Sequence, residues 1–205
     1  MMRLTRPAIA GLVTAAALMA CKGNKDQYAS GALDTSTIKA MPSTDTTTPP
    51  AAVAVVTWAG PTVIAFTETA SDGEIRLGRL AQKKAISADV KAFARRMVNE
   101  HNAMLADSKK LATKLKVSAD TTAADVRDLA THGHDALTEL TNKAEGADWD
   151  RLYMDKMVEG HQNVLTKLQN AANGAGGDVR SALDRAIVKV EAHLAKAKEV
   201  RAKLG

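Results

Sequence analysis

The chain has 205 residues, a formal net charge of +5, one cysteine and only 3% aromatic residues. A single cysteine excludes an intramolecular disulfide, and the scarcity of aromatic side chains argues against a nucleic-acid partner, because nothing offers a stacking platform or a basic stripe. The abundance of Ala, Leu, Lys and Val favours helices over strands.

The first twenty residues are typical of a bacterial lipoprotein signal peptide. Arg3 and Arg6 form a basic start, an apolar run follows to Met19, and small Ala20 precedes Cys21. We therefore expect cleavage before Cys21 and attachment of acyl chains to this residue. The run is short of the roughly 20 residues that span a membrane. The alternative is an ordinary secretory signal in which Cys21 stays unmodified.

Residues 21–59 are expected to be a lipidated cysteine followed by a disordered tether. The segment is rich in Ser, Thr, Asp, Gly and Pro, and it holds too little apolar surface to form a core. Lys22, rather than an acidic residue, follows Cys21, which favours the outer membrane. The predicted location is the cell envelope, as an outer-membrane lipoprotein facing the periplasm, with the bacterial membrane as partner through the lipid.

Residues 60–205 are predicted to form one all-α domain. Apolar side chains recur there at alternating three- and four-residue steps, which indicates antiparallel helix packing. Ser87 is the expected N-cap of one helix, and Gly174, Gly176 and Gly177 end another. The expected helices cover residues 62–85, 87–116, 121–145, 148–172 and about 178–204. The third is the most polar, so we expect it to cross over or cap a bundle of the other four.

Three histidines interrupt these apolar stripes: His101, His161 and His193, each on a different helix. At 1.5 Å per residue, each lies roughly 21–24 Å from a helix end, close to the middle of the bundle. Glu74 reaches a similar level on the first helix. Three imidazoles and one carboxylate could therefore meet at mid-bundle. Such a set of ligands suits a transition metal, Cu or Zn.

Methionines and the remaining polar residues refine this prediction. Met97 and Met157 each stand four residues before a histidine and are possible soft ligands for copper, although methionine on such a stripe usually fills the core. Glu100, Glu159 and Glu191 lie one or two residues from a histidine, so we expect them to point away from the site. His132 and His134 are expected to be exposed.

A structural role for the histidines is the alternative to a metal site. Buried histidines can hydrogen-bond one another or a carboxylate and fix the register of the helices. In that case the protein is a non-catalytic envelope component, structural or stress-related, whose helices dock onto another partner. No nucleophile triad, phosphate loop or dinucleotide fingerprint is present in the sequence, and an enzyme is not expected.

Four segments resemble a known family. They are residues 74–85, residues 90–101 with the Met-Val-x-x-His element, residues 150–161, and residues 193–197. Over residues 60–204 the chain is similar to the predicted outer-membrane proteins grouped as domain of unknown function 4142. The resemblance implies a ferritin-like four-helix bundle exported to the bacterial envelope, with His101, His161 and His193 at the family's histidine positions. It implies no activity.

Overall fold

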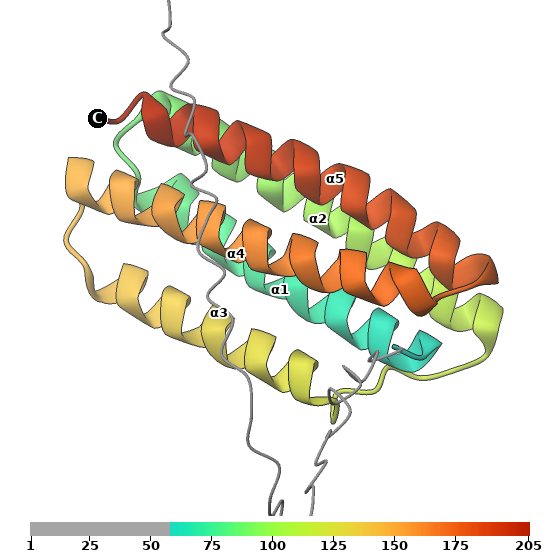
Figure 1. Cartoon of the computed structure of the whole chain (residues 1–205). Coiled ribbons are helices and arrows are strands. Elements are labelled where there is room, and N and C mark those ends of the chain that lie inside the picture. The colour runs from blue at the N-terminus through green and yellow to red at the C-terminus, as the bar shows by residue number, and fades with distance from the viewer. Residues whose placement is uncertain (1–57) are drawn as a thin grey trace, which may run out of the picture. The chain divides into compact units, whose positions relative to one another are not determined.

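The computed structural model describes residues 58–205, which form an all-helical structure (Figure 1). The predicted signal peptide, the predicted lipidation site Cys21 and the predicted tether, up to residue 57, lie outside the described residues. The described part contains five helices: α1 (Gly60–Lys84), α2 (Ala88–Leu115), α3 (Ala124–Asn142), α4 (Ala147–Gly174) and α5 (Gly177–Ala202). All five predicted helices are thus confirmed, with ends that differ by one to three residues.

Local signals in the sequence set the helix ends. Pro61 occupies the first turn of α1, where its missing N–H costs no hydrogen bond. The Ser87 side chain accepts a hydrogen bond from the Val90 N–H and caps α2, as predicted. Gly177 adopts a φ of 56° in the short turn between α4 and α5, a left-handed conformation that glycine adopts without strain.

Trp58 shows that the packed region begins two residues earlier than predicted. Its side chain is buried against Phe66, with ring centroids 4.5 Å apart. Its indole Nε1–H donates to Asp125 Oδ2 over 3.1 Å. Trp58 was expected to belong to the tether, but its large apolar ring is better placed in the core, where its one polar atom finds an acceptor.

Contacts between the helix ends fix the direction of each helix. Asp150, buried at the start of α4, accepts from the backbone N–H groups of Ile86 and Ser87 at 3.2 and 2.7 Å. Lys114, near the end of α2, pairs with Asp178 in the first turn of α5 at 2.6 Å. Helices α1 and α2 therefore form one antiparallel hairpin, and α4 and α5 form another.

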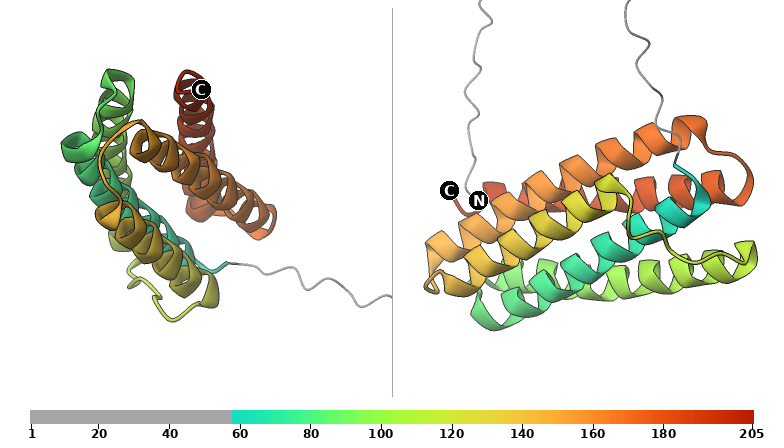
Figure 2. Two further views of the ribbon diagram at one scale, coloured as in Figure 1. Left: turned by 90° about the vertical axis from the view of Figure 1, so that its left-hand side faces the viewer. Right: turned by 90° about the horizontal axis from the view of Figure 1, so that it is seen from below.

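Helix α3 lies alongside α1 and α4 (Figure 2). Near its start, the backbone N–H of Asp120 donates to Pro61 O at 3.0 Å. At its end, Lys84 Nζ donates to the backbone oxygens of Leu140, Thr141 and Lys143. Only Val126 and Leu140 of α3 are buried. The helix is therefore held at both ends, while its middle is largely exposed.

Helix α1 is buried on more than one side, which the sequence did not reveal. Val63, Phe66 and Leu77 are buried on α1. Ile64, Ser71 and Ile75 are buried as well, because α1 also packs against α3. A helix between several neighbours has no single apolar face.

The core is divided into two apolar clusters along the helices. One contains Phe66, Met104, Leu165 and Val190, and the other contains Leu77, Met97, Met157 and Ala197. On α2 and α4, His101 and His161 lie between residues of the two clusters in sequence, and on α5 His193 lies close to the boundary between them. The polar layer is therefore near the middle of the helices, as the sequence predicted.

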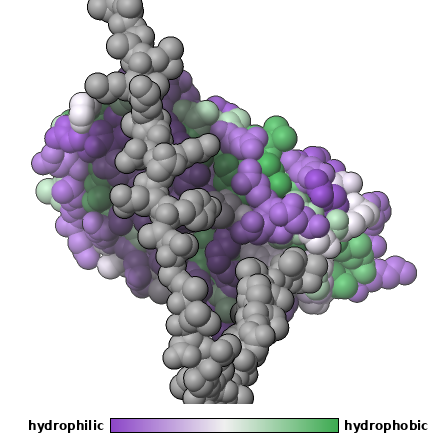
Figure 3. Space-filling model, viewed as in Figure 1, coloured by the Kyte–Doolittle hydropathy of each residue, from purple (hydrophilic) through white to green (hydrophobic). Residues whose placement is uncertain are grey.

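The described part of the chain includes no helix that combines the length and the apolar character needed to span a membrane. Where described residues are visible in Figure 3, hydrophilic side chains predominate and hydrophobic ones form small separate groups. Ile86 and Val188, at 60% and 65% exposure, are the large hydrophobic side chains that residues 58–205 expose.

Candidate metal centre

Helices α2, α4 and α5 each contribute one buried histidine to a cluster formed by His101, His161 and His193. Their exposed fractions are 2%, 3% and 0%. The ring centroids lie 6.0 Å (His101–His161), 5.1 Å (His101–His193) and 5.4 Å (His161–His193) apart. The predicted convergence of the three histidines is confirmed, and we call them the histidine cluster.

Two rings of the histidine cluster are oriented by hydrogen bonds on one nitrogen. His161 Nδ1 lies 2.8 Å from the backbone oxygen of Met157, and His193 Nε2 lies 2.7 Å from Glu100 Oε2. A carbonyl or carboxylate oxygen can only accept, so each of these nitrogens must carry the proton. In a neutral ring the other nitrogen then presents a lone pair, Nε2 in His161 and Nδ1 in His193.

Those lone-pair nitrogens are buried and have no hydrogen-bond partner within residues 58–205. The same is true, in this part of the chain, of both nitrogens of His101. Leaving a buried polar group unsatisfied costs about 1–3 kcal/mol. A metal ion that binds nitrogen lone pairs would satisfy one nitrogen of each ring.

Burial favours the neutral form of the His101 and His193 imidazoles. It lowers the pKa of His101 well below its usual value, and the charges of His161 and His193 act in the same direction. Burial also lowers the pKa of His193 to about 4, although the hydrogen bond to Glu100 opposes this shift. A neutral imidazole is the form that binds a metal ion, so His101 and His193 need no deprotonation to bind one at neutral pH.

The distances within the cluster are close to those of a three-histidine metal site. One nitrogen from each ring can be chosen so that all three lie within 4.8 Å of one another. A point then exists within about 2.8 Å of all three, since 4.8 Å divided by the square root of three is the upper limit. Zinc–imidazole bonds measure about 2.0–2.1 Å. If each ring moved about 0.7 Å toward this point, its nitrogen would reach the zinc–imidazole bond length.

Glu100 corrects one prediction. Because Glu100 precedes His101 directly, we expected its side chain to point away from the site. It does leave α2 on a different side from His101, but that side faces α5, and its carboxylate meets the outer nitrogen of His193. Arg96 Nε donates to the other carboxylate oxygen at 2.6 Å. Burial raises the pKa of Glu100, but the hydrogen bonds from Arg96 and His193 outweigh it and lower the pKa overall.

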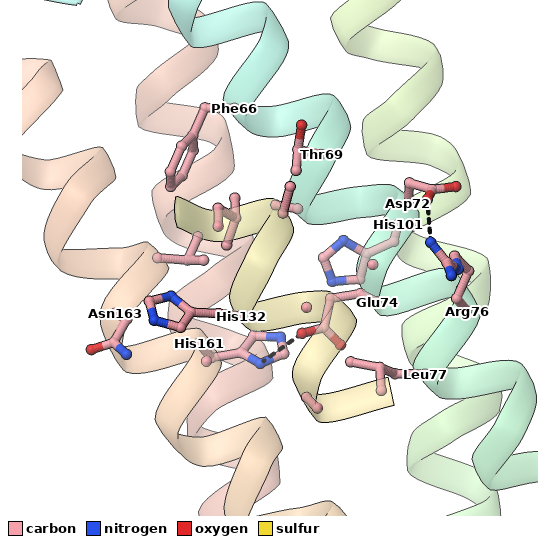
Figure 4. A pocket seen from close by; sticks show the side chains of 18 of the residues that line it. Phe66, Thr69, Asp72, Glu74, Arg76, Leu77, His101, His132, His161 and Asn163 are labelled. Carbon is pink, nitrogen blue, oxygen red and sulfur yellow. Dashed lines mark ion pairs between the residues drawn. The ribbon is translucent and has the colours of Figure 1, made fainter. Parts of the chain in front are cut away.

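Glu74, predicted as a fourth ligand, lies beside the cluster. Its Oε1 is 3.8 Å from His161 Nδ1 (Figure 4), which is the nitrogen already bonded to Met157 O. Its carboxylate is not part of the set whose ligand atoms lie within 4.8 Å. Its side chain is 14% exposed, and burial raises its pKa although the charge of His161 opposes the shift. The closest acid to the histidine cluster is therefore Glu100 rather than Glu74.

The two candidate methionine ligands are buried in the apolar cluster near Leu77. Met97 is fully buried, and Met157 is 1% exposed. Met157 contributes its backbone oxygen to the orientation of His161. Both positions are consistent with core packing.

A cavity of about 760 Å³ lies next to the histidine cluster. Its walls come from α1, α2, α3 and α4, with Val190 from α5, and His101, His161 and Glu74 all line it (Figure 4). His132 and His134 are exposed on α3, as predicted, and they line the same cavity. This cavity was not predicted from the sequence, because it depends on how α3 packs against α1 and α4.

Comparison with protein families gives one result. The family model described as Domain of unknown function (DUF4142) matches residues 45–200. This is most of the chain, so the protein belongs to this family, and the resemblance seen in the sequence is confirmed. Searches of the curated proteins and of the solved structures give no significant match.

Proposed function

We propose that this member of the DUF4142 family binds a transition metal ion, copper or zinc, through His101, His161 and His193. The observation that carries the proposal is the convergence of buried imidazole nitrogens that find no partner among residues 58–205. We assign His161 Nε2 and His193 Nδ1 as ligand atoms, because the opposite nitrogen of each ring is hydrogen-bonded.

The surroundings of the rings support this assignment. Histidines that bind metals commonly donate their other N–H to a carboxylate or a backbone oxygen, which fixes the tautomer. Glu100 and the Met157 carbonyl occupy these two positions. Three imidazoles and no thiolate suit zinc or copper better than a calcium or magnesium site, which requires oxygen ligands.

We extend the proposal to the fold and the location. In a ferritin-like four-helix bundle, two antiparallel hairpins are joined by one long crossover. The hairpins α1–α2 and α4–α5, with α3 between them in the chain, suit this arrangement. Cleavage before Cys21 and lipidation of this residue would anchor the domain to an envelope membrane. We favour the outer membrane, with the domain facing the periplasm.

The structural role of the histidines remains the second candidate. The hydrogen bond between His193 and Glu100 favours it, because this bond ties α5 to α2. The unsatisfied nitrogens of His101, for which residues 58–205 supply no partner, count against it. A docking role would be supported by a broad exposed apolar surface. In residues 58–205 the exposed large hydrophobic side chains are those of Ile86 and Val188, and two side chains do not form such a surface.

Thermal unfolding with and without metal separates the two candidates. Under the metal proposal, zinc or copper in excess of the dissociation constant raises the Tm of the wild type by mass action, and His101→Ala or His161→Ala abolishes the increase. His134→Ala is the matched control, because His134 is exposed on α3, and it should retain the full increase. An unchanged wild-type Tm with either metal supports the structural role instead.

A further inference from the structure

The cavity beside the histidine cluster has the size of a small-molecule site. Pockets for such ligands measure about 300–1,000 Å³ and combine apolar walls with a few polar groups. This one measures about 760 Å³, and its lining combines apolar side chains such as Phe66 and Leu168 with charged ones such as Asp72, Arg76 and Lys156. It is therefore large enough for an organic molecule rather than for water alone.

Three glycines from three different helices line this cavity: Gly73 on α1, Gly133 on α3 and Gly160 on α4. A Cβ atom built on Gly73 or Gly133 would meet no described atom within 4 Å. On Gly160 it would meet Glu74 Oε1 at 4.0 Å, an ordinary contact. Side chains at these positions would project into open space.

Helix packing does not account for these glycines. Glycine inside a helix is destabilising relative to alanine, so a glycine there normally has a steric reason. Gly78 has one, because a Cβ atom would lie 2.8 Å from Val98 Cγ2. Gly73, Gly133 and Gly160 lack such a neighbour in the described structure, and their φ angles are not positive. What they share is the cavity.

Buried polar groups form part of the cavity wall. His101 and His161 line it, are at least 97% buried, and carry nitrogens without a partner in the part of the chain that the structure describes. Figure 4 shows the side chains of His101, Glu74 and His161 close together. A molecule in the cavity could therefore contact apolar side chains such as Phe66 and Leu77 and also lie beside His101 and His161.

We propose that this cavity binds a small amphipathic molecule whose apolar body fills the space left by the three glycines and whose single donor group binds the metal at the histidine cluster. The inference rests on the proposed function, because the donor group is recognised by the metal ion. Three histidines leave at least one coordination position of a four-coordinate ion open to such a ligand.

Two probes that differ only in their apolar body test this proposal. The protein is produced from residue 21 onward with Cys21→Ser, loaded with Co²⁺ as a coloured substitute for zinc, and titrated with imidazole and with 4-phenylimidazole while the visible spectrum is recorded. Both probes offer the same nitrogen donor. We expect 4-phenylimidazole to bind at least tenfold more tightly, because its phenyl ring enters the apolar cavity.

The variant Gly133→Leu tests whether the apolar part of the ligand lies in the cavity. It fills the cavity from α3, the helix that carries no residue of the histidine cluster, and it should remove the tenfold preference while leaving Co²⁺ binding intact. Because leucine favours a helix over glycine, its Tm should not fall. Thr138→Leu is the matched control, since Thr138 is exposed on the same helix and is not part of the cavity lining.

The outcomes are distinguishable. Equal affinity for the two probes, or a preference that survives Gly133→Leu, overturns this inference and leaves the metal site standing. A wild-type protein that does not bind Co²⁺ overturns both the inference and the proposed function.

Discussion

The Glu100 carboxylate orients the His193 ring within the histidine cluster. It accepts the Nε2 proton of His193 and is itself bonded to Arg96. This pairing fixes which nitrogen of His193 faces the cluster. A carboxylate in this position usually raises the affinity of a histidine ligand for its metal, and removing it costs about 10- to 100-fold.

Glu100→Gln should therefore weaken metal binding about 10- to 100-fold and leave the protein folded. Competition with a chromophoric chelator measures the affinity, and circular dichroism checks the helices. The matched control is Glu191→Gln, because Glu191 is exposed on α5 two residues before His193. An unchanged affinity in Glu100→Gln would show that the carboxylate does not orient the ligand.

The metal-free protein should lose stability as the pH falls from about 6.5 to 4. Unfolded histidine takes up a proton near pH 6.5, whereas folded His193 does so only at about 4 because it is buried. Between these values the unfolded state binds more protons, so the free energy of unfolding falls by up to about 1.4 kcal/mol per pH unit for this residue. The lowered pKa of His101 acts in the same direction.

Neighbouring carboxyl groups modify this pH profile. The pKa of Glu100 is lowered, so its contribution to stability is lost below pH 4.5. The pKa of Glu74 is raised by burial, so it partly offsets the loss. Urea unfolding in EDTA at several pH values measures the slope, and His193→Leu should flatten it. A wild-type stability that stays constant from pH 6.5 to 4.5 would contradict these assignments.

At the scale of helices, the approach of α1 to α2 depends on Gly78. A Cβ atom there would lie 2.8 Å from Val98 Cγ2 and 3.0 Å from the backbone oxygen of Ala94. The two helices can pack this closely only because glycine has no side chain. Gly73, five residues earlier on α1, has no described neighbour within 4 Å of such an atom.

Alanine at these two glycines should have opposite effects. Gly78→Ala should destabilise the fold by about 1–3 kcal/mol, because α1 and α2 must move apart. Gly73→Ala should stabilise it by about 0.5–1 kcal/mol through helix propensity alone. Urea unfolding of both variants measures the difference. If both variants were stabilised, the close packing of α1 on α2 would be wrong.

The sequence predicted the helices and the histidine cluster because both follow from local patterns. Ser87 caps its helix, and His101, His161 and His193 replace apolar residues within a regular repeat. The position of α3 was not predictable, since only Val126 and Leu140 anchor it in the core. The cavity and the contact between Glu100 and His193 depend on how helices pack, and spacing along one helix does not show this.

Asp150 illustrates the same limit. Nothing in its local sequence indicates that this carboxylate, 1% exposed, holds the turn between α1 and α2 by accepting from two backbone N–H groups. Such a contact joins residues more than 60 positions apart. Predicting this contact would have required knowing that the start of α4 lies beside the turn between α1 and α2.

At the scale of the whole molecule, the proposed lipidation of Cys21 would decide where the domain resides. If Cys21 is lipidated as proposed, the wild type should incorporate labelled fatty acid and partition into detergent, and Cys21→Ser should lose both properties. Membrane fractionation after metabolic labelling gives the result. Recovery of a wild-type protein that is free of lipid and keeps its first twenty residues would contradict the lipoprotein proposal.

The proposed metal centre is tested most directly by elemental analysis of the purified protein. The protein from residue 21 onward with Cys21→Ser is incubated with zinc or copper, dialysed and measured for metal per chain. We expect about one ion per chain, and much less in His101→Ala and His161→Ala. A wild-type protein that retains neither metal after dialysis, or variants that retain as much as the wild type, would contradict a metal site at His101, His161 and His193.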